Sequence, residues 1–192
     1  MPEPPGPEHT TALILAGGLS RRMGQPKAWI HWRGQPLIRH VAQRIGPQTG
    51  QHLLNLHPQQ EGTLPGWQVV HDLRPGFPGP LAGIETGLLH CSTPWLLIVP
   101  CDMPRLPKDL LGRLAQALKP GTRLIAARTT ERHFPVVALV HRDVLQPTRA
   151  FLDSGQRRLM DWHRRCDGQW CLFPDPMAFS NFNRPEQLQT EP

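Results

Sequence analysis

An apolar run that breaks into a loop rich in glycine and in cations stands near the start of the chain: Ala12-Leu13-Ile14-Leu15-Ala16-Gly17-Gly18-Leu19-Ser20-Arg21-Arg22-Met23-Gly24-Gln25-Pro26-Lys27. Five consecutive apolar residues are typical of a strand that is covered on both faces. The two glycines let the backbone turn sharply and bring N–H groups close to an anion, and the two arginines and the lysine add positive charge. The stretch therefore predicts a phosphate-binding loop after a buried strand, with a simple tight turn and a solvated pair of arginines as the alternative.

Spacing excludes two well-known phosphate loops. A P-loop has Gly-Lys followed by Ser or Thr, but Gly24 is followed by Gln25, Pro26, Lys27 and Ala28, so no hydroxyl adjoins the lysine. The dinucleotide fingerprint requires alternating glycines that lead directly into a helix. Here the first glycines are adjacent, and Pro26 prevents a helix from continuing through the loop.

Length and composition indicate one domain. The 192 residues can bury about 70% of the surface that the unfolded chain exposes. We expect residues 1–11 to be a disordered tail, since they contain prolines and lack both a basic region and an apolar core of a signal peptide. Residues 12–192 are expected to form the domain. Apolar runs have strand length, which predicts a soluble, cytoplasmic protein.

A net charge of +6 implies an anionic partner. The paired arginines are far apart in sequence and lack interleaved aromatic residues, so we expect a small anionic ligand, with neither nucleic acid nor membrane as a partner. Four cysteines without a C-x-x-C pair argue against a zinc site and against a disulfide scaffold. The ten histidines are scattered and lack metal-ligand spacing.

Strand patterns alternate with helical patterns along the chain. Strands are predicted at residues 12–16, 28–32, 52–56, 67–71, 95–99, 124–127, 134–140 and 170–173. Helices are predicted at residues 36–45, 81–90, 108–118 and 142–165, the last interrupted at Ser154-Gly155, with a short helix opening at Pro185. The alternation predicts an α/β fold, a three-layer Rossmann-like domain with a mainly parallel, mixed central sheet. Pro135 suggests that its strand lies at an edge or begins there.

Asp102 follows the strong strand pattern of residues 95–99 and precedes Met103-Pro104. In open α/β sheets, ligands bind at the carboxyl ends of the strands. Asp102 could hold Mg²⁺ there, because magnesium takes one or two carboxylates and completes its shell with phosphate oxygens and water. The alternative is a helix N-cap or turn aspartate. With the glycine-rich loop, Asp102 predicts a magnesium–nucleotide site that works by positioning and charge neutralisation, without a protein nucleophile.

Several motifs resemble those of the molybdenum cofactor guanylyltransferase family (MobA), within the nucleotidyltransferases of the sugar-nucleotide pyrophosphorylase fold. Besides the first loop, the resemblance rests on Pro78-Gly79-Pro80-Leu81-Ala82-Gly83, Pro100-Cys101-Asp102-Met103-Pro104, Phe134-Pro135-Val136-Val137-Ala138-Leu139, Gln156-Arg157-Arg158-Leu159-Met160 and Asn181-Phe182-Asn183-Arg184-Pro185-Glu186. These motifs occur in order between Ala12 and Leu188.

The resemblance implies transfer of GMP from GTP to molybdopterin, giving molybdopterin guanine dinucleotide and pyrophosphate, with Mg²⁺ as the metal. It further implies transient contacts with cofactor-biosynthesis proteins and molybdoenzyme chaperones. Asp102, Lys27 and Arg22 would be catalytic, with Asp102 as the metal ligand. The residues implied for GTP binding are Leu15, Ala16, Gly17, Gly18, Lys27, Asn55, Asp72 and Asp102. Those for pterin binding are Gly83, Asn181 and Asn183, and we add Arg157 and Arg158 on charge alone; Gly24 or Gln25 also match substrate-handling positions.

Some of these residues have structural alternatives. Asn55 and Asp72 each follow an apolar run and could cap a turn. Asn181 and Asn183 alternate along an extended segment, so their side chains could face one ligand or bond the local backbone. Pro26 stands where the family commonly has an aspartate before the loop lysine, so an acid that could orient Lys27 is missing.

Other functions remain open at this point. Leu-Ala-Gly-Gly resembles the guanine-using branch, yet a CTP-dependent molybdopterin cytidylyltransferase or another nucleotidyltransferase fits much of the pattern. A non-catalytic carrier of nucleotide or molybdopterin is a further alternative, and it would not need a metal ligand at Asp102.

Overall fold

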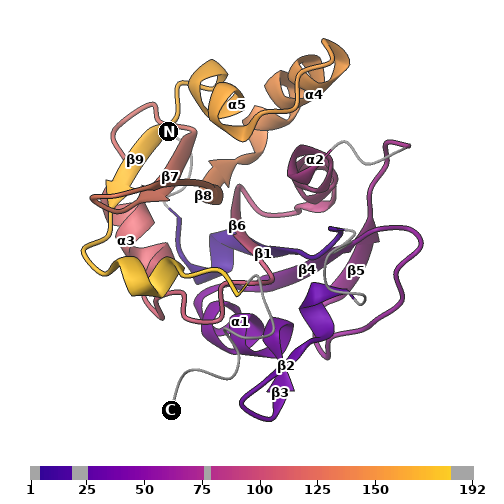
Figure 1. Cartoon of the computed structure of the whole chain (residues 1–192). Helices are drawn as coiled ribbons and strands as arrows, with labels where there is room; N and C mark the ends of the chain where they lie inside the picture. Colours follow the sequence, from indigo (N-terminus) through magenta and orange to yellow (C-terminus); the bar gives the residue numbers. More distant parts are fainter. Residues whose placement is uncertain (1–4, 19–25, 76–78, 183–192) are drawn as a thin grey trace.

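A seven-stranded mixed sheet forms the centre of the computed structural model, which describes residues 5–18, 26–75 and 79–182 (Figure 1). In spatial order the strands are β5 (Gln68–His71), β4 (Gln51–Leu56), β1 (Thr10–Leu15), β6 (Trp95–Pro100), β8 (His133–His141), β7 (Leu124–Arg128) and β9 (Gln169–Leu172). The first four are parallel to one another, β8 is antiparallel to β6 and β7, and β9 is parallel to β7. The predicted mainly parallel, mixed sheet is confirmed.

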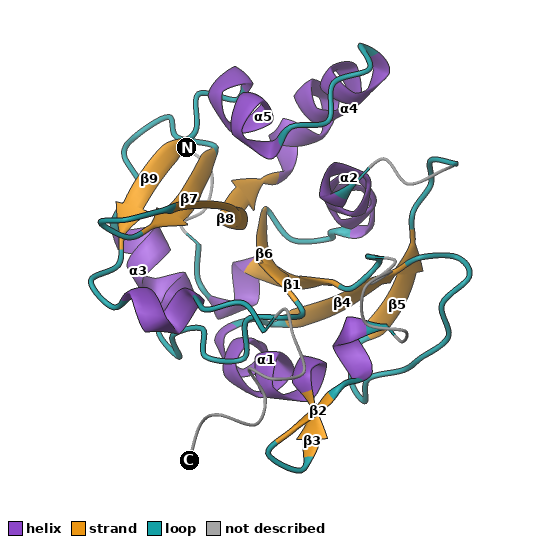
Figure 2. Cartoon of the chain, in the orientation of Figure 1, coloured by secondary structure: helices purple, strands orange, loops and turns teal. Residues whose placement is uncertain are grey.

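Helices cover both faces of the sheet, which gives three layers (Figure 2). Helices α1 (Leu37–Ile45) and α3 (Leu110–Gln116) pack on one face, and α2 (Pro80–His90), α4 (Leu145–Asp153) and α5 (Leu159–Arg165) pack on the other. The remaining elements are short: 3-10 turns η1 (Pro7–His9), η2 (Lys27–Trp29), η3 (Gly46–Gln48), η4 (Arg142–Val144) and η5 (Pro176–Phe179), and the hairpin strands β2 (His31–Trp32) and β3 (Gln35–Pro36). The layered α/β fold predicted from the alternation is confirmed.

Strand β1 is buried on both faces, as its uninterrupted apolar run predicts. Successive side chains of a strand point to opposite faces of the sheet. Accordingly Ala12 and Ile14 join the core beneath α1 and α3, whereas Leu13 and Leu15 join the core beneath α2, α4 and α5. One strand therefore anchors both helical layers and fixes where its carboxyl end emerges.

The ordered structure begins before the predicted boundary at Ala12. Strand β1 starts at Thr10, and the side chains of Thr10 and Thr11 are fully buried. The Thr11 hydroxyl lies 2.7 Å from the Thr93 hydroxyl, and the Gly50 N–H donates to the Pro7 carbonyl at 2.7 Å. These partners explain why polar residues that look like a tail continue the central strand.

Two strand predictions need correction. Residues 28–32 were expected to form a strand, but Lys27–Trp29 forms the 3-10 turn η2, closed by the Trp29 N–H to Pro26 carbonyl bond of 3.1 Å, and only His31–Trp32 is strand. Strand β8 is internal and not an edge. Its Pro135 lies where the register with β7 shifts between Ala126 and Ala127, and an irregularity of this kind needs no hydrogen bond from the proline.

The predicted interruption between the last helices is confirmed at Ser154 and Gly155, where α4 has ended and Gly155 has a positive φ of 83°. Strand β9 closes the sheet beside β7, as predicted for residues 170–173. The short helix predicted to open at Pro185 lies outside the described residues. In the described part of the chain, no helix has the length and apolarity needed to cross a membrane.

Candidate active site

The carboxyl ends of four parallel strands meet at one edge of the sheet. Leu15 of β1 pairs with Asn55 of β4 and with Pro100 of β6, and Leu56 pairs with His71 of β5. The loops that follow these strands enclose a cavity of about 450 Å³, a volume typical of small-molecule sites. Its lining residues are Leu15, Ala16, Gly17, Gly18, Lys27, Asn55, Asp72, Gly79, Pro80, Pro100, Cys101, Asp102 and Val136.

Backbone hydrogen bonds hold the first loop at this edge. The Ala16 N–H donates to the Asn55 carbonyl at 2.9 Å, so the ladder with β4 continues past Leu15. A Cβ added to Gly17 would lie 3.3 Å from the backbone nitrogen of His57, whereas one added to Gly18 would meet nothing within 4 Å. Gly17 therefore permits close approach of two chain segments, and Gly18 leaves open space beside the cavity.

Lys27 and Asp102 form an ion pair at the cavity. The Lys27 Nζ lies 2.5 Å from Asp102 Oδ2, and the two side chains are 15% and 17% exposed. Lys27 lies in the turn η2, and Asp102 lies two residues after the end of β6. The residue between, Cys101, donates its N–H to the Leu15 carbonyl at 3.1 Å. The structure therefore brings together two of the predicted site residues, the loop lysine and the aspartate after β6.

Asn55 and Asp72 form a second polar pair in the same cavity. Asn55 Nδ2 donates to Asp72 Oδ1 at 2.8 Å. Burial raises the pKa of Asp72 above its ordinary value of 3.8, and the hydrogen bond from Asn55 and the neighbouring His57 and His71 oppose that shift. The pair thus combines an amide with a carboxylate whose charged form is costly unless it is further solvated or bonded.

Gly83 does not line the cavity, and its predicted pterin-binding role stays a prediction. A Cβ at Gly83 would lie 2.3 Å from Asn55 Oδ1 and 2.7 Å from Leu15 Cδ2. A real Cβ cannot approach so closely, so helix α2 packs directly on Asn55 because this position has no side chain. In this structure Gly83 acts on the site through the placement of Asn55.

The start of helix α2 contributes a partial positive charge. Gly79 and Pro80 line the cavity, Gly79 has a φ of 80°, and no side chain of the described residues caps the helix. The N-terminus of a helix of this length attracts anions through its unpaired N–H groups. The cavity is therefore bordered by a lysine and by a helix N-terminus, both of which favour an anionic ligand.

Cys101 lines the cavity but is a poor nucleophile. Burial and then the neighbouring Asp102 raise the pKa of its thiol to about 12. The thiolate is the reactive form of cysteine, so a thiol that stays protonated at neutral pH is inert. The four cysteines are free.

Asn181 is held near Asp102, the candidate metal ligand, by a backbone hydrogen bond of the next residue. The Phe182 N–H donates to the Asp102 carbonyl at 3.0 Å, and Phe182 packs with Ile30, Trp32 and Leu37 in a separate apolar cluster. Within the described part of the chain, the buried Asn181 Oδ1 has no hydrogen-bond partner. A buried acceptor of this kind is costly unless a ligand or water supplies a donor.

Arg157 and Arg158 do not line the cavity. Arg157 Nη1 donates to the Leu152 carbonyl at 2.7 Å and to the Gln156 carbonyl at 2.6 Å, while Arg158 is largely exposed beside Asp161. Their pterin-binding role stays a prediction. The predicted residues Arg22 and Asn183, together with Arg21, Gly24 and Gln25, lie outside the described residues.

The described side chains contain no group of three or more His, Cys, Asp or Glu that could hold a metal ion. Asp102 nevertheless suits magnesium, because it offers carboxylate oxygens beside a cavity large enough for a polyphosphate, whose oxygens would complete the shell. The donor chemistry fits a hard cation shared between protein and substrate, and it does not fit a metal held by protein ligands alone.

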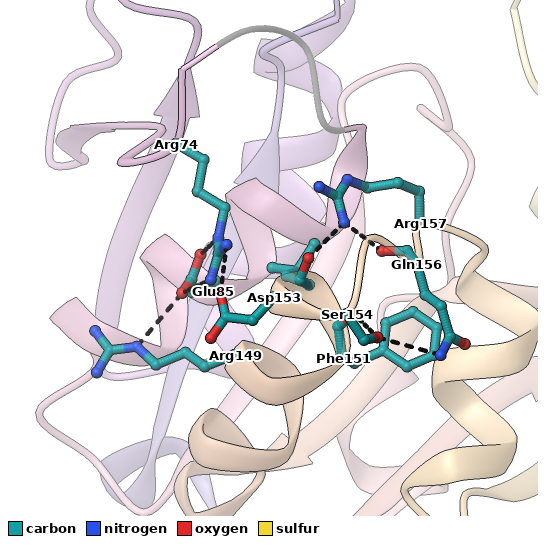
Figure 3. A network of polar contacts seen from close by, with 9 residues as sticks. Arg74, Glu85, Arg149, Phe151, Asp153, Ser154, Gln156 and Arg157 are labelled. Atoms are coloured by element: carbon teal, nitrogen blue, oxygen red, sulfur yellow. Dashed lines mark hydrogen bonds and ion pairs between the residues drawn. The ribbon is translucent and has the colours of Figure 1, made fainter.

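Sequence reasoning missed two features of the site. Val136 lines the cavity because the irregularity in β8 redirects it, and the only signal was the proline beside it. An ion-pair network around Glu85, shown in Figure 3, fastens the segment after Asp72 to α2 and α4. Nothing in the spacing of Arg74 and Glu85 indicates this, since the two lie on different elements.

A family model described as "MobA-like NTP transferase domain" matches residues 12–166. The chain belongs to the MobA-like NTP transferase family. Curated relatives in this family include the molybdenum cofactor guanylyltransferases of Vibrio cholerae, 40% identical with 95% of this chain and 91% of the relative covered, and of Shewanella piezotolerans, also 40% identical with 93% and 89% covered. This confirms the family resemblance drawn from the motifs.

Solved structures agree on the fold of this MobA-like chain. The molybdopterin-guanine dinucleotide biosynthesis protein A of Archaeoglobus fulgidus superposes with a TM-score of 0.72 at 21% identity, covering 93% of this chain and 95% of that one. The 2-C-methyl-D-erythritol 4-phosphate cytidylyltransferase of Thermus thermophilus has a TM-score of 0.69 at 14% identity, covering 92% and 94%. At these identities the likeness is one of architecture, and it confirms the nucleotidyltransferase type of fold.

Proposed function

We propose that this protein is a molybdenum cofactor guanylyltransferase, which transfers GMP from GTP to the terminal phosphate of molybdopterin. The products are molybdopterin guanine dinucleotide and pyrophosphate. Family membership and the guanylyltransferase names of relatives at 40% identity support the proposal. A cytoplasmic location goes with it, because both substrates must reach the site from a soluble pool.

The observation that carries the proposal is the 2.5 Å ion pair between Lys27 and Asp102, which both line a cavity bordered by Gly17 and Gly18. A carrier of nucleotide needs cationic groups only. A carboxylate placed among the groups that would meet phosphates repels them unless a cation lies between, and this favours a catalytic metal–nucleotide site.

Positioning accounts for most of the proposed chemistry. An oxygen of the pterin phosphate attacks the α-phosphorus of GTP, one P–O bond forms, and the bond from the α-phosphorus to the bridging oxygen breaks as pyrophosphate leaves. The second pKa of a phosphate monoester is about 6, so the attacking oxygen is largely unprotonated at neutral pH and no general base is required. This agrees with a cavity in which the thiol of Cys101 is inert.

The described residues divide the work. The backbone from Leu15 to Gly18 and the side chains of Lys27, Asn55 and Asp72 would hold GTP, with Lys27 neutralising phosphate charge as it does the charge of Asp102. Asn181, held beside Asp102 by the Phe182 backbone bond, would face the second substrate. Arg22 and Asn183 keep their predicted roles on the grounds of the motifs alone.

Asp102 would hold Mg²⁺ together with oxygens of the triphosphate. When bound, the metal would neutralise charge on the phosphates and help to orient the α-phosphate. Lys27 would then exchange its contact with Asp102 for contacts with phosphate oxygens. The ion pair keeps both side chains at the cavity for that exchange.

A thermal-shift panel with magnesium and each nucleoside triphosphate tests the nucleotide half of the proposal. A ligand at about 100 times its dissociation constant stabilises a protein by about 2.7 kcal/mol, so GTP should raise the melting temperature clearly. CTP is the critical comparison: an equal shift with CTP would contradict the guanylyl assignment. An Asp102→Asn variant tests the metal ligand, because it should lose the magnesium-dependent part of the shift.

A further inference from the structure

A network of four charged side chains, Arg74, Glu85, Arg149 and Asp153, lies beyond the cavity on the face of α2 that packs against α4 (Figure 3). Arg74 donates to both oxygens of the Glu85 carboxylate, from Nε to Oε2 at 2.6 Å and from Nη2 to Oε1 at 3.0 Å. The remaining guanidinium nitrogen, Nη1, lies 2.7 Å from Asp153 Oδ1. All three nitrogens of Arg74 are therefore directed by partners.

Because this network is partly buried, it contributes more to the relative orientation of the segments it joins than to stability. The Glu85 side chain is 5% exposed and that of Arg74 is 24% exposed. Removing such a pair from water costs free energy that the attraction barely repays, so apolar replacements are often as stable. A bidentate arginine–carboxylate contact does, however, fix the relative orientation of the two segments that carry it.

The network completes a circuit of contacts that begins and ends on α2. Gly83 of α2 lets the helix contact Asn55, and Asn55 donates to Asp72. Two residues after Asp72 comes Arg74, which returns to Glu85 on the same helix.

Gly83 and Glu85 are two positions apart, about 200° around the helix axis, so the circuit holds α2 on opposite faces. The Asn55–Asp72 pair lies inside this circuit. Displacement of the segment after β5 from α2 would therefore carry Asp72 away from Asn55.

We propose that Glu85 is a positioning residue, which acts through Arg74 to hold Asp72 and its hydrogen bond with Asn55 in the nucleotide cavity. This inference rests on the proposed function for its effect on GTP, but its structural half is independent of any ligand. Arg149 offers a matched comparison. Its Nε lies 3.4 Å from Glu85 Oε1, but among the described residues it makes no hydrogen bond or ion pair with Arg74, Asp72 or Asn55.

The kinetic test compares Glu85→Gln and Arg74→Lys with the control Arg149→Gln in the full-length protein. Glu85→Gln removes the charge, whereas Arg74→Lys keeps a cation but loses the fork. We expect both to raise the KM for GTP about tenfold while kcat and the KM for molybdopterin change less than about twofold. Arg149→Gln should leave all three constants near those of the wild type.

A second measurement needs no nucleotide. In wild-type protein the side-chain amide of Asn55 donates to Asp72, so its two N–H signals should be well separated and in slow exchange with solvent in an NMR spectrum. Arg74→Lys should move the two signals toward those of an amide without this hydrogen bond and speed their exchange with solvent, and Arg149→Gln should not. Arg74→Lys is the safer variant for folding, since it leaves a cation for Glu85 and Asp153.

The outcomes separate this inference from the proposed function. If the wild type does not bind GTP but Arg74→Lys alters the Asn55 signals, the function is wrong and the positioning role stands. Unchanged Asn55 signals and an unchanged KM in both variants would overturn the positioning role. A fall in melting temperature with unaltered Asn55 signals and KM would also overturn it, because that pattern indicates a structural role only.

Discussion

Lys27 Nζ lies 2.5 Å from Asp102 Oδ2, although 75 positions separate the two residues in the chain. The lysine lies in the turn η2 after the first loop. The aspartate follows β6, the strand that pairs with β1. Each offsets the charge of the other in a place where both are mostly buried. The pair links the phosphate-binding end of the proposed site to its metal-binding end.

Removal of Lys27 should affect the reaction far more than the fold. In Lys27→Ala the Asp102 carboxylate loses its partner and the triphosphate loses a cation, so we expect turnover to fall about 100-fold or more. Steady-state product formation measures this. Lys108→Ala, which removes an exposed lysine that does not line the cavity, should keep wild-type turnover. Equal losses in the two variants would show that general charge, and not this position, matters.

Gly83→Ala should weaken both the fold and the nucleotide site. The new Cβ would lie 2.3 Å from Asn55 Oδ1, so either α2 or Asn55 must move. We expect a loss of about 1–3 kcal/mol in the free energy of unfolding, measured by urea titration, and weaker GTP binding. Gly112→Ala in α3 is the control, because nothing lies within 4 Å of its added Cβ and alanine favours a helix. A Gly83→Ala protein as stable as the control would contradict the packing described.

Asp72→Asn should make the protein more stable at neutral pH. Burial raises the pKa of Asp72 in the folded state above the ordinary 3.8, so the folded state binds the proton more tightly than the unfolded state. Stability from this group therefore falls as pH rises from 3.8 through the folded-state pKa, and the penalty persists above it. The gain of Asp72→Asn over wild type should be present at pH 7 and fade as pH falls toward 3.8.

Melting temperatures of the two proteins across that pH range would measure this effect, and GTP binding by Asp72→Asn should decrease at the same time. An Asp72→Asn variant that is less stable than wild type at pH 7 would mean that the carboxylate is stabilised by partners rather than penalised by burial.

Asn181→Ala should affect the second substrate selectively. Its buried Oδ1 lacks a partner among the described residues, and the Phe182–Asp102 backbone bond places it beside the proposed metal ligand. We expect the KM for molybdopterin to rise about tenfold and the KM for GTP to stay unchanged. Separate saturation curves for the two substrates provide the test. A rise confined to the KM for GTP would assign Asn181 to the nucleotide half instead.

The sequence predicted the strands and the residues at their ends because those signals are local. A few neighbouring residues are enough to recognise each of three features: the apolar run of β1, the glycines after it, and Asp102 after β6. The parallel arrangement then brings these ends together.

What could not be predicted depends on contacts between distant segments. The role of Gly83 requires knowing that α2 rests on Asn55, and the interior place of β8 requires knowing the irregularity at Pro135. The pterin-binding role of Arg157 and Arg158, which was drawn from charge alone, stays a prediction; Arg157 is bonded to the Leu152 carbonyl at the end of α4, and Arg158 lies at the surface beside Asp161. Charge alone does not reveal which face of the fold a side chain occupies.

Transfer of label from GTP is the most direct measurement of the central claim. Purified protein, magnesium and molybdopterin would be incubated with GTP that carries a labelled phosphate at either the α or the γ position. We expect that α-label enters a molybdopterin guanine dinucleotide while γ-label leaves as pyrophosphate, and that Asp102→Asn abolishes both. Equal incorporation from α-labelled CTP, or no incorporation from GTP, would contradict it.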